Sequence, residues 1–290
     1  MSSIAYITDS TMLENHRLLE NKTMNFWRLS TKINFSDFRV GDLVFFLSKD
    51  KVHRRKGEKG IVGFGRLKEL RIYSPGTMWR KYGKDNGFNT RKEFEDALIK
   101  ISKDNQLPTK ISSMYLEDIV FFQTPTYLSE YGMKISKQVE SYVYIDDLKV
   151  AFNILEYAKK AYDTWTSEED ITTKLDEAQI RLALFNVQHQ LPAFKISENT
   201  KKAIHRKMKN YIKEHPDYEF ISDNMLTIFN INENHLTIVL DKEKEMDDRM
   251  LIGQAYLYRY YLLEAYPYDL DIIFKEIDDD NVESILKTII

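Results

Sequence analysis

The chain contains no cysteine, and this absence removes several classes of chemistry. Without thiols there can be no disulfide, no thiolate zinc site, no iron–sulfur cluster and no cysteine nucleophile. The six histidines show none of the close spacings typical of metal ligands. A metal site in this protein would therefore be built mainly from oxygen ligands, which favours Mg²⁺, Mn²⁺ or Ca²⁺.

The chain also lacks a long apolar run. Its longest uncharged apolar stretches, such as residues 43–48 and 236–240, are far shorter than the roughly 20 residues that cross a bilayer. The first residues include Asp9 and Glu14 and have no basic start followed by an apolar stretch, so they do not have the pattern of a secretory signal. We expect a cytoplasmic protein with no membrane contact.

Glycine and proline are scarce, with ten and six residues among 290, whereas 43% of the chain is hydrophobic. This composition excludes wholesale disorder and is sufficient for one large domain or two ordinary ones. The net charge of −3 conceals an asymmetry: residues 1–150 carry 25 Lys and Arg against 19 Asp and Glu, and residues 151–290 carry 17 against 26. The basic excess is concentrated in residues 51–100, where either a phosphate-bearing partner or a solvated loop would explain it.

The first 147 residues have the pattern of a small, mostly β domain. Residues 43–47 and 60–73 are rich in β-branched and aromatic residues, and the basic residues 49–59 between them fit a hairpin loop. Residues 90–103 have helical spacing, with Thr90 as the N-cap. We expect two further strands at residues 118–123 and 141–146.

Helical spacing then continues through residues 148–195, which we expect to form a helical connector. Residues 196–290 predict a basic helix at 197–213, a hairpin of strands 225–231 and 235–240, a helix at 250–265, a strand at 270–277 and a last helix at 282–289. This order favours an α/β sandwich with a mixed sheet. The basic face of the helix at 197–213 would contact either DNA or solvent, and the tyrosines at 256, 258, 260 and 261 suit a core and an interface.

Three short motifs give the N-terminal half a family resemblance. They are Asn25-Phe-Trp-Arg28, Phe38-Arg-Val-Gly-Asp-Leu-Val-Phe-Phe46 and Gly60-Ile-Val-Gly-Phe-Gly65. Together they resemble the EVE branch of the PUA-like superfamily over roughly residues 2–147. The resemblance implies a β-barrel-type domain, with a Gly41-Asp42 turn before a buried strand and close approach of another backbone or a ligand at Gly63 and Gly65.

EVE-like domains hold an extruded, often modified, base in a pocket with aromatic walls. The resemblance implies roles for the following residues here: Trp27, Phe46, Trp79 and Tyr82 in the pocket wall, Ser48 in a polar contact, and Arg54, Arg55 and Lys56 on phosphates. Core packing is the alternative for each aromatic residue. Phe45 and Phe46 are adjacent in a strand and point to opposite faces, so we expect at least one of them in the core.

The C-terminal half carries a second resemblance. Residues 235–244 followed by residues 251–260 are similar to the centre of PD-(D/E)xK nucleases, in which an acidic residue opens one strand and an acid-x-Lys motif ends the next. Aligned by its apolar run, the strand has Leu240 where a carboxylate is expected. A shift of one residue instead gives Asp241-Lys242-Glu243.

The shifted alignment implies a set of catalytic residues. In this chemistry carboxylates converge on a divalent cation that activates water, and a nearby ammonium group orients that water. The implied residues are Asp223, Asp241 and Glu243 as ligands of Mg²⁺ or Mn²⁺, Lys242 or Lys244 as the ammonium, and Gln254 close to the site. The alternative is that residues 241–248 form only a charged turn.

Joined together, the two halves predict an α+β protein with three parts: a base-reading domain at 1–147, a connector at 148–195 and a nuclease-like domain at 196–290. The function implied is a modification-dependent restriction endonuclease that cuts modified phage DNA, as a homodimer because each such site cleaves one strand. The alternative is a non-catalytic binder of modified DNA or RNA, whose C-terminal half is a degenerate nuclease fold used for dimerisation or partner binding.

Overall fold

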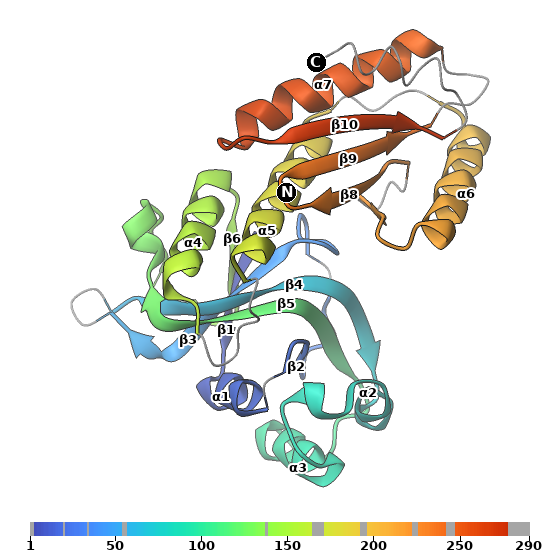
Figure 1. The fold of residues 1–290 in the computed structure, drawn as a ribbon. Coiled ribbons are helices and arrows are strands. Elements are labelled where there is room, and N and C mark those ends of the chain that lie inside the picture. Colours follow the sequence, from blue (N-terminus) through green and yellow to red (C-terminus); the bar gives the residue numbers. More distant parts are fainter. Residues whose placement is uncertain are drawn as a thin grey trace. The chain divides into compact units, whose positions relative to one another are not determined.

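The computed structural model describes residues 3–19, 21–33, 35–53, 57–136, 139–163, 171–191, 196–221, 226–241 and 247–277. The chain divides into two compact units, Met1–Ile171 and Thr172–Ile290, called unit 1 and unit 2 below. Both are built on mixed sheets, so the fold is α+β as expected (Figure 1). Among the described residues, no helix has the length and apolar character needed to cross a lipid bilayer.

Unit 1 is organised around a six-stranded sheet with the order β2-β5-β4-β3-β1-β6. The strands are β1 (Ser3–Thr8), β2 (Met24–Arg28), β3 (Leu43–Val52), β4 (Lys59–Tyr73), β5 (Ile111–Thr126) and β6 (Tyr142–Ile145). β1 runs parallel to β3, and every other neighbouring pair is antiparallel. The predicted hairpin of β3 and β4 is confirmed, and its pairing continues to Val52 and Lys59.

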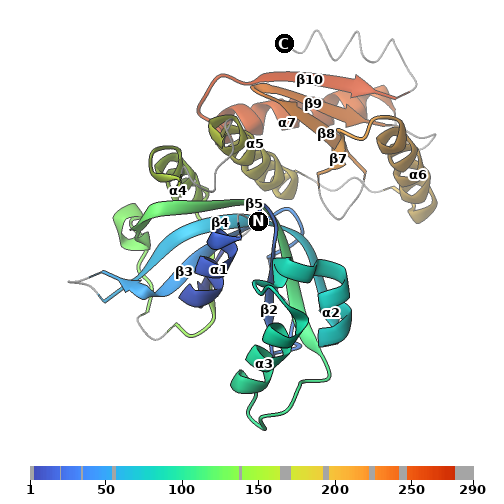
Figure 2. The ribbon, with the colours of Figure 1, turned by 60° about the horizontal axis from the view of Figure 1, so that its bottom comes forward.

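The long strands β4 and β5 are strongly curved (Figures 1 and 2). Their pairing shifts register between Ile61 and Gly63 and again further along, and such irregularities increase the bend and twist of a strand. A Cβ atom at Gly63 would lie 2.4 Å from the Val120 carbonyl oxygen, so only glycine fits there. The close approach predicted at this glycine is confirmed, and it lets the sheet curl.

The curled sheet has a core on its inner face. This core joins side chains from five strands, namely Ile4, Tyr6, Phe26, Val44, Phe46, Leu67, Met114, Leu116 and Phe121. Phe46 contacts Phe121 there, with ring centroids 6.2 Å apart. Phe45 points to the opposite face and contacts Phe64 at 6.0 Å. Both phenylalanines are fully buried: Phe46 lies in the inner core, and Phe45 lies on the outer face, which helix α4 (Leu148–Ala161) covers through contacts such as Tyr157 with Phe122.

The remaining helices of unit 1 have clear sequence signals at their starts. The side chain of Asp9 caps α1 (Ser10–Leu18), and Ser74 caps α2 (Pro75–Tyr82), which has proline in its first turn. Thr90 and Glu93 form a capping box for α3 (Arg91–Ile101), as Thr90 predicted. Figure 2 shows α2 and α3 together at one end of the β4–β5 pair. Neither α1 nor α2 was predicted from the sequence.

Unit 2 has a four-stranded sheet with the order β10-β9-β8-β7. Its elements are α5 (Ile171–Gln190), α6 (Glu198–Glu214), β7 (Glu219–Phe220), β8 (Ile228–Asn232), β9 (His235–Leu240), α7 (Asp248–Ala265) and β10 (Asp271–Glu276). β10 is parallel to β9, and the other pairs are antiparallel. The predicted series of helix, hairpin, helix and strand is confirmed, whereas the helix predicted at 282–289 lies outside the described residues.

Both faces of this sheet are covered by helices. Ile204 and Met208 of α6 pack against Ile228 of β8, and Phe185 of α5 contacts the next residue, Phe229, at 6.0 Å. Because successive strand residues point to opposite faces, α6 and α5 cover opposite faces of the sheet. Residues 148–195, predicted as one helical connector, are divided between the two units: α4 belongs to unit 1, and nearly all of α5 belongs to unit 2.

Candidate functional site

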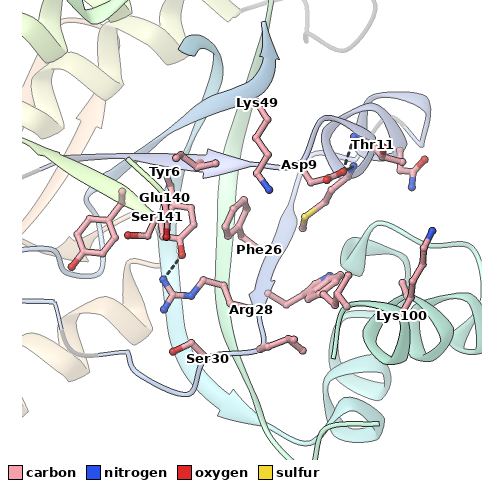
Figure 3. Close-up of a pocket in the computed structure, with 18 of the residues that line it drawn as sticks. Tyr6, Asp9, Thr11, Phe26, Arg28, Ser30, Lys49, Lys100, Glu140 and Ser141 are labelled. Atoms are coloured by element: carbon pink, nitrogen blue, oxygen red, sulfur yellow. Dashed lines mark hydrogen bonds between the residues drawn. The ribbon is translucent and has the colours of Figure 1, made fainter. Parts of the chain in front are cut away.

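Unit 1 contains a pocket of about 1020 Å³ between β2 and β6, the two edge strands of its sheet (Figure 3). Helices α1 and α3 contribute to its walls through residues such as Met12 and Ala97. Arg28 of β2 donates a hydrogen bond across the space to the Tyr6 hydroxyl of β1. The curled sheet thus brings its edges close enough for side chains to face each other, and the pocket lies between them.

The inner wall of the pocket is aromatic. Phe26 meets the ring of Tyr6 edge-on at 4.9 Å, and Tyr142 of β6 stacks on Tyr6 at 5.9 Å with the rings 13° from parallel. Phe35 contacts Tyr142 edge-on at 5.1 Å and also lines the pocket. These contacts fix the rings, so the wall is formed before any ligand arrives.

Trp27 lines the same pocket and is held from behind. Its indole nitrogen donates to the Asn86 carbonyl at 3.1 Å, and its ring meets Phe94 of α3 edge-on at 5.5 Å. The side chain is half-buried. The indole N–H is therefore already used, so Trp27 offers a ligand mainly its ring surface.

Cations outnumber acids in the pocket lining. Arg28, Lys32, Lys49 and Lys100 line it, against Asp9 and Glu140. The Asp9 carboxylate is occupied in capping α1, where it accepts from the backbone N–H of Thr11 at 2.9 Å. Figure 3 shows the Lys49 side chain reaching into the space above Phe26. The balance of charge favours an anionic ligand.

The Tyr6 hydroxyl is a further polar group in this wall. Burial raises its pKa, and the lowering effect of the neighbouring Arg28 does not cancel that rise. The phenol therefore keeps its proton at neutral pH. The hydroxyl oxygen accepts a hydrogen bond from Arg28, so the hydroxyl group would donate its own hydrogen to an acceptor atom of a ligand.

The other predicted wall residues lie elsewhere in unit 1. Phe46 is fully buried in the core of the curled sheet. Trp79 stacks on Phe94 at 6.0 Å, and Tyr82 stacks on Tyr115 at 4.5 Å, so both pack the α2–α3 cluster. None of these three aromatic residues lines the large pocket. Their positions fit the core-packing alternative.

Ser48 also lies outside the large pocket. Its hydroxyl is 3.1 Å from that of Ser10, and it lines a smaller cavity of about 120 Å³ together with Arg17 and Lys51. The predicted phosphate-binding residues Arg54, Arg55 and Lys56 lie outside the described residues. Of the residues predicted to bind a base, the structure therefore brings only Trp27 to the large pocket.

In unit 2, Asp241 directly follows β9 and is 4% exposed. Lys207 of α6 donates to its Oδ1 at 3.4 Å. The remaining predicted ligands and ammonium groups, Asp223, Glu243, Lys242 and Lys244, lie outside the described residues. Across the described ranges, no group of three acidic or histidine side chains is placed to hold a metal ion.

Gln254 lies in α7, one turn before Tyr258. Tyr258 is fully buried, and its hydroxyl donates to the side-chain oxygen of Gln188 in α5. Burial raises the pKa of Tyr258, while a hydrogen bond with Gln254 acts in the opposite direction. Gln254 thus supports a buried polar contact between helices.

Several pocket residues were missed by sequence reasoning. Arg28 belongs to a motif used for the family resemblance, yet only its neighbour Trp27 was assigned to the wall. Lys49 stands where β3 changes from buried to exposed residues, which is a signal available in the sequence. Tyr142 comes from the opposite end of the domain, and nothing in its local sequence indicates that it faces β2.

Comparisons with known proteins give no family for this chain. No protein-family model matches it, and no curated protein matches it. The crystal structure of ASCH from Zymomonas mobilis is 13% identical, with a TM-score of 0.35 over 51% of this chain and 91% of that chain. A mutant of the same protein is 12% identical, with a TM-score of 0.38 over 54% and 98%. Scores this low do not establish a shared fold, so we take no function from these structures.

Proposed function

We propose that unit 1 binds nucleic acid by taking one extruded nucleotide, with a modified base, into the pocket between β2 and β6. The observation that carries this proposal is the combination of a fixed aromatic wall and a surplus of cations in one pocket. Aromatic faces stack on bases, and lysine and arginine side chains neutralise phosphates. A volume of about 1020 Å³ suits a whole nucleotide better than a bare base.

The energetics of such binding are favourable for the residues present. Extruding a base from a duplex costs a few kcal/mol, and stacking on an aromatic side chain contributes about 1–3 kcal/mol per base. Trp27 supplies a ring surface for stacking. Lys49 and Lys100 supply charge, and the Tyr6 hydroxyl and the Glu140 carboxylate are polar groups for the base edge. Modified DNA is the proposed ligand, with modified RNA as the alternative.

The two tryptophans of unit 1 allow a matched test. Full-length protein carrying Trp27→Ala or Trp79→Ala is titrated with duplexes that contain cytosine, 5-methylcytosine, hydroxymethylcytosine or glucosylated hydroxymethylcytosine. Removing Trp27 is expected to weaken binding of the preferred duplex by about 10- to 100-fold. Removing Trp79, which packs on Phe94 outside the pocket, is expected to leave binding close to wild type once folding is checked.

Two results would contradict the proposal. One is equal loss of affinity in the two variants, which would point to damage to the domain and not to a lost stacking surface. The other is equal affinity of the wild-type protein for all four duplexes together with full binding by Trp27→Ala. Binding of matched RNA in preference to every duplex would transfer the proposal to RNA.

A second candidate function is Mg²⁺-dependent cleavage of that nucleic acid, which would make the protein a modification-dependent restriction endonuclease used in phage defence. The observation favouring it is a buried carboxylate, Asp241, at the end of a central strand with the Lys207 ammonium beside it. This carboxylate is the one predicted metal ligand among the described residues. It could form part of a Mg²⁺ or Mn²⁺ site only together with other acidic residues.

A cleavage assay separates the two functions. Wild-type protein, Asp241→Asn and Asp271→Asn are incubated with the preferred duplex and Mg²⁺ or Mn²⁺. The nuclease proposal predicts loss of cleavage in Asp241→Asn and full cleavage in Asp271→Asn, because Asp271 is exposed and pairs with His235. Intact DNA after incubation with wild-type protein, despite binding, would leave the non-catalytic binder as the function.

A further inference from the structure

Helix α7 has two faces of different character. Leu251, Ala255, Tyr258 and Leu262 are buried against the rest of unit 2. On the opposite side, Gly253, Tyr256, Tyr260 and Leu263 are exposed. At 3.6 residues per turn these four residues fall within an arc of about 80°, so they form one continuous stripe. We call these four residues the α7 stripe.

The α7 stripe is unusually apolar for a protein surface. Tyr256 is 57% exposed, Tyr260 55% and Leu263 51%. Charged residues are what the outer face of a helix normally carries. Tyrosine is a residue type enriched at protein–protein interfaces, where its ring is buried and its hydroxyl remains at the wet rim. The stripe therefore has the composition of an interface.

Charges at the two ends of the stripe favour one kind of partner. Arg249 lies just before it and Glu264 at its end, and both are exposed. When two α7 helices are placed antiparallel about a point between Tyr256 and Leu257, Arg249 of each copy lies opposite Glu264 of the other. The same register places Gly253 opposite Tyr260, and a Cβ at Gly253 would meet nothing within 4 Å in this chain.

We infer that α7 is a homodimerisation helix, which pairs antiparallel with α7 of a second copy through the α7 stripe. The pairing is self-complementary: Tyr260 of one copy fills the space over Gly253 of the other, and opposite charges meet at both ends. An interface of this type repeats the same contacts under a two-fold axis. This inference is independent of the ligand pocket in unit 1.

The size of the surface sets the expected strength. A single pair of helices of this length buries less area than the roughly 1,200–2,000 Å² of standard stable interfaces. We therefore expect a weak dimer whose population rises with protein concentration. Reversal of one charge, as in Arg249→Glu, replaces two symmetric attractions by repulsions and should raise the dissociation constant by about tenfold.

The absence of cysteine makes cross-linking a direct test. Two full-length variants, Tyr256→Cys and Leu263→Cys, each introduce one thiol at a similarly exposed position of the stripe. In the antiparallel register, position 256 lies beside itself in the partner, whereas the two copies of position 263 are about 20 Å apart along the helix axis. Mild oxidation should therefore link Tyr256→Cys into a covalent dimer and leave Leu263→Cys monomeric.

A double variant and a charge exchange complete the test. Arg249→Cys combined with Glu264→Cys should cross-link between copies, because these positions are opposite each other. Arg249→Glu and Glu264→Arg should each weaken self-association in analytical ultracentrifugation, and the double charge reversal should restore it. Restoration would not occur if the substitutions had only damaged the fold.

A different pairing of the two helices, or a different partner of the α7 stripe, predicts different cross-linking results. Cross-linking at both positions 256 and 263 would indicate parallel pairing and overturn the antiparallel register. A chain that stays monomeric at every concentration, with no cross-link in any variant, would overturn the inference altogether. That result would leave the chain's own residues 278–290, or a different protein, as the candidate partner of the stripe.

Discussion

The two units use different means to place charged groups. Unit 1 has 27 Lys and Arg against 24 Asp and Glu, whereas unit 2 has 15 against 21. In unit 1 the candidate ligand groups project from strands and helices into a pocket whose walls are packed aromatic rings. In unit 2 the candidate carboxylate, Asp241, stands at the junction between a strand and a charged segment.

The two units therefore differ in how completely their candidate sites are formed. The unit 1 pocket is fixed by contacts among side chains from β1, β2 and β6, so its shape and charge can be stated residue by residue. The candidate metal site of unit 2 needs further acidic ligands, and those predicted from the sequence belong to the segments before β8 and after β9. We therefore propose ligand binding for unit 1 first, and keep cleavage by unit 2 as the second candidate.

The largest expected effect tests whether binding belongs to unit 1 alone. Phe229 is fully buried in the unit 2 sheet, where it contacts Phe185. Replacement by alanine should destabilise unit 2 by about 3–5 kcal/mol, measured by urea unfolding. Binding of the preferred duplex under native conditions should fall much less than in Trp27→Ala. Equal loss in the two variants would show that unit 2 is required for binding.

A smaller effect on unit 1 comes from His16, a fully buried residue of α1. Burial lowers its pKa from 6.5 to about 4. The unfolded chain therefore binds a proton at a pH where the folded chain does not, and acid favours unfolding. This contribution is present in full above pH 6.5 and is lost as the pH falls towards 4, amounting to about 3 kcal/mol.

The measurement is the free energy of unfolding of unit 1 at a series of pH values. In His16→Gln the decline between pH 6.5 and 4 should be shallower than in the wild-type protein, because the variant has no group that titrates at this position. The comparison uses the slope and not the absolute stability, since the substitution also changes packing. Identical slopes would show that His16 takes up its proton as readily in the folded protein as in the unfolded chain.

The last test concerns the basic face of α6, which the proposed pocket in unit 1 does not require for binding. Lys202, Arg206, Lys209 and Lys213 are exposed and recur at helical spacing. If this face contacts a duplex backbone through all four residues, changing them to glutamine should reduce the slope of log affinity against log salt by about 3.6. The same change at Lys103 and Lys110, exposed in unit 1, provides a control of similar chemistry. An unaltered slope would leave the α6 face as solvated surface and confine the contact to unit 1.

Local patterns predicted much of the secondary structure. Helical spacing and the Thr90 cap predicted α3, and runs of β-branched residues predicted β3, β4 and β9. Each prediction lies within a few residues of the observed ends, except that β3 extends to Val52. The N-caps Asp9 and Ser74 were equally available, but α1 and α2 are short, with nine and eight residues. Strand β5 was predicted too short because its polar residues, such as Ser112 and Ser113, are buried.

The pocket was harder to predict because it depends on contacts distant in sequence. Trp27 is followed by an arginine in the sequence, and the structure places it at the pocket. Trp79 had the same local signal, but α2 turns it onto Phe94. Phe46 is a second example of a position that local sequence does not settle. Strand alternation predicts that Phe45 and Phe46 lie on opposite faces, but the face of Phe46 becomes the core only because the sheet curls. Tertiary packing decides which of two similar signals faces a ligand.

The central claim is that a base enters the unit 1 pocket and contacts Trp27. The chain has three tryptophans, so a variant with Trp79→Phe and Trp165→Phe retains Trp27 as its one source of indole fluorescence. Titration with the preferred modified duplex should quench this fluorescence, and the quenching should saturate at the same concentration as binding followed by anisotropy of a labelled duplex. Unchanged Trp27 emission while anisotropy reports full binding would contradict the claim.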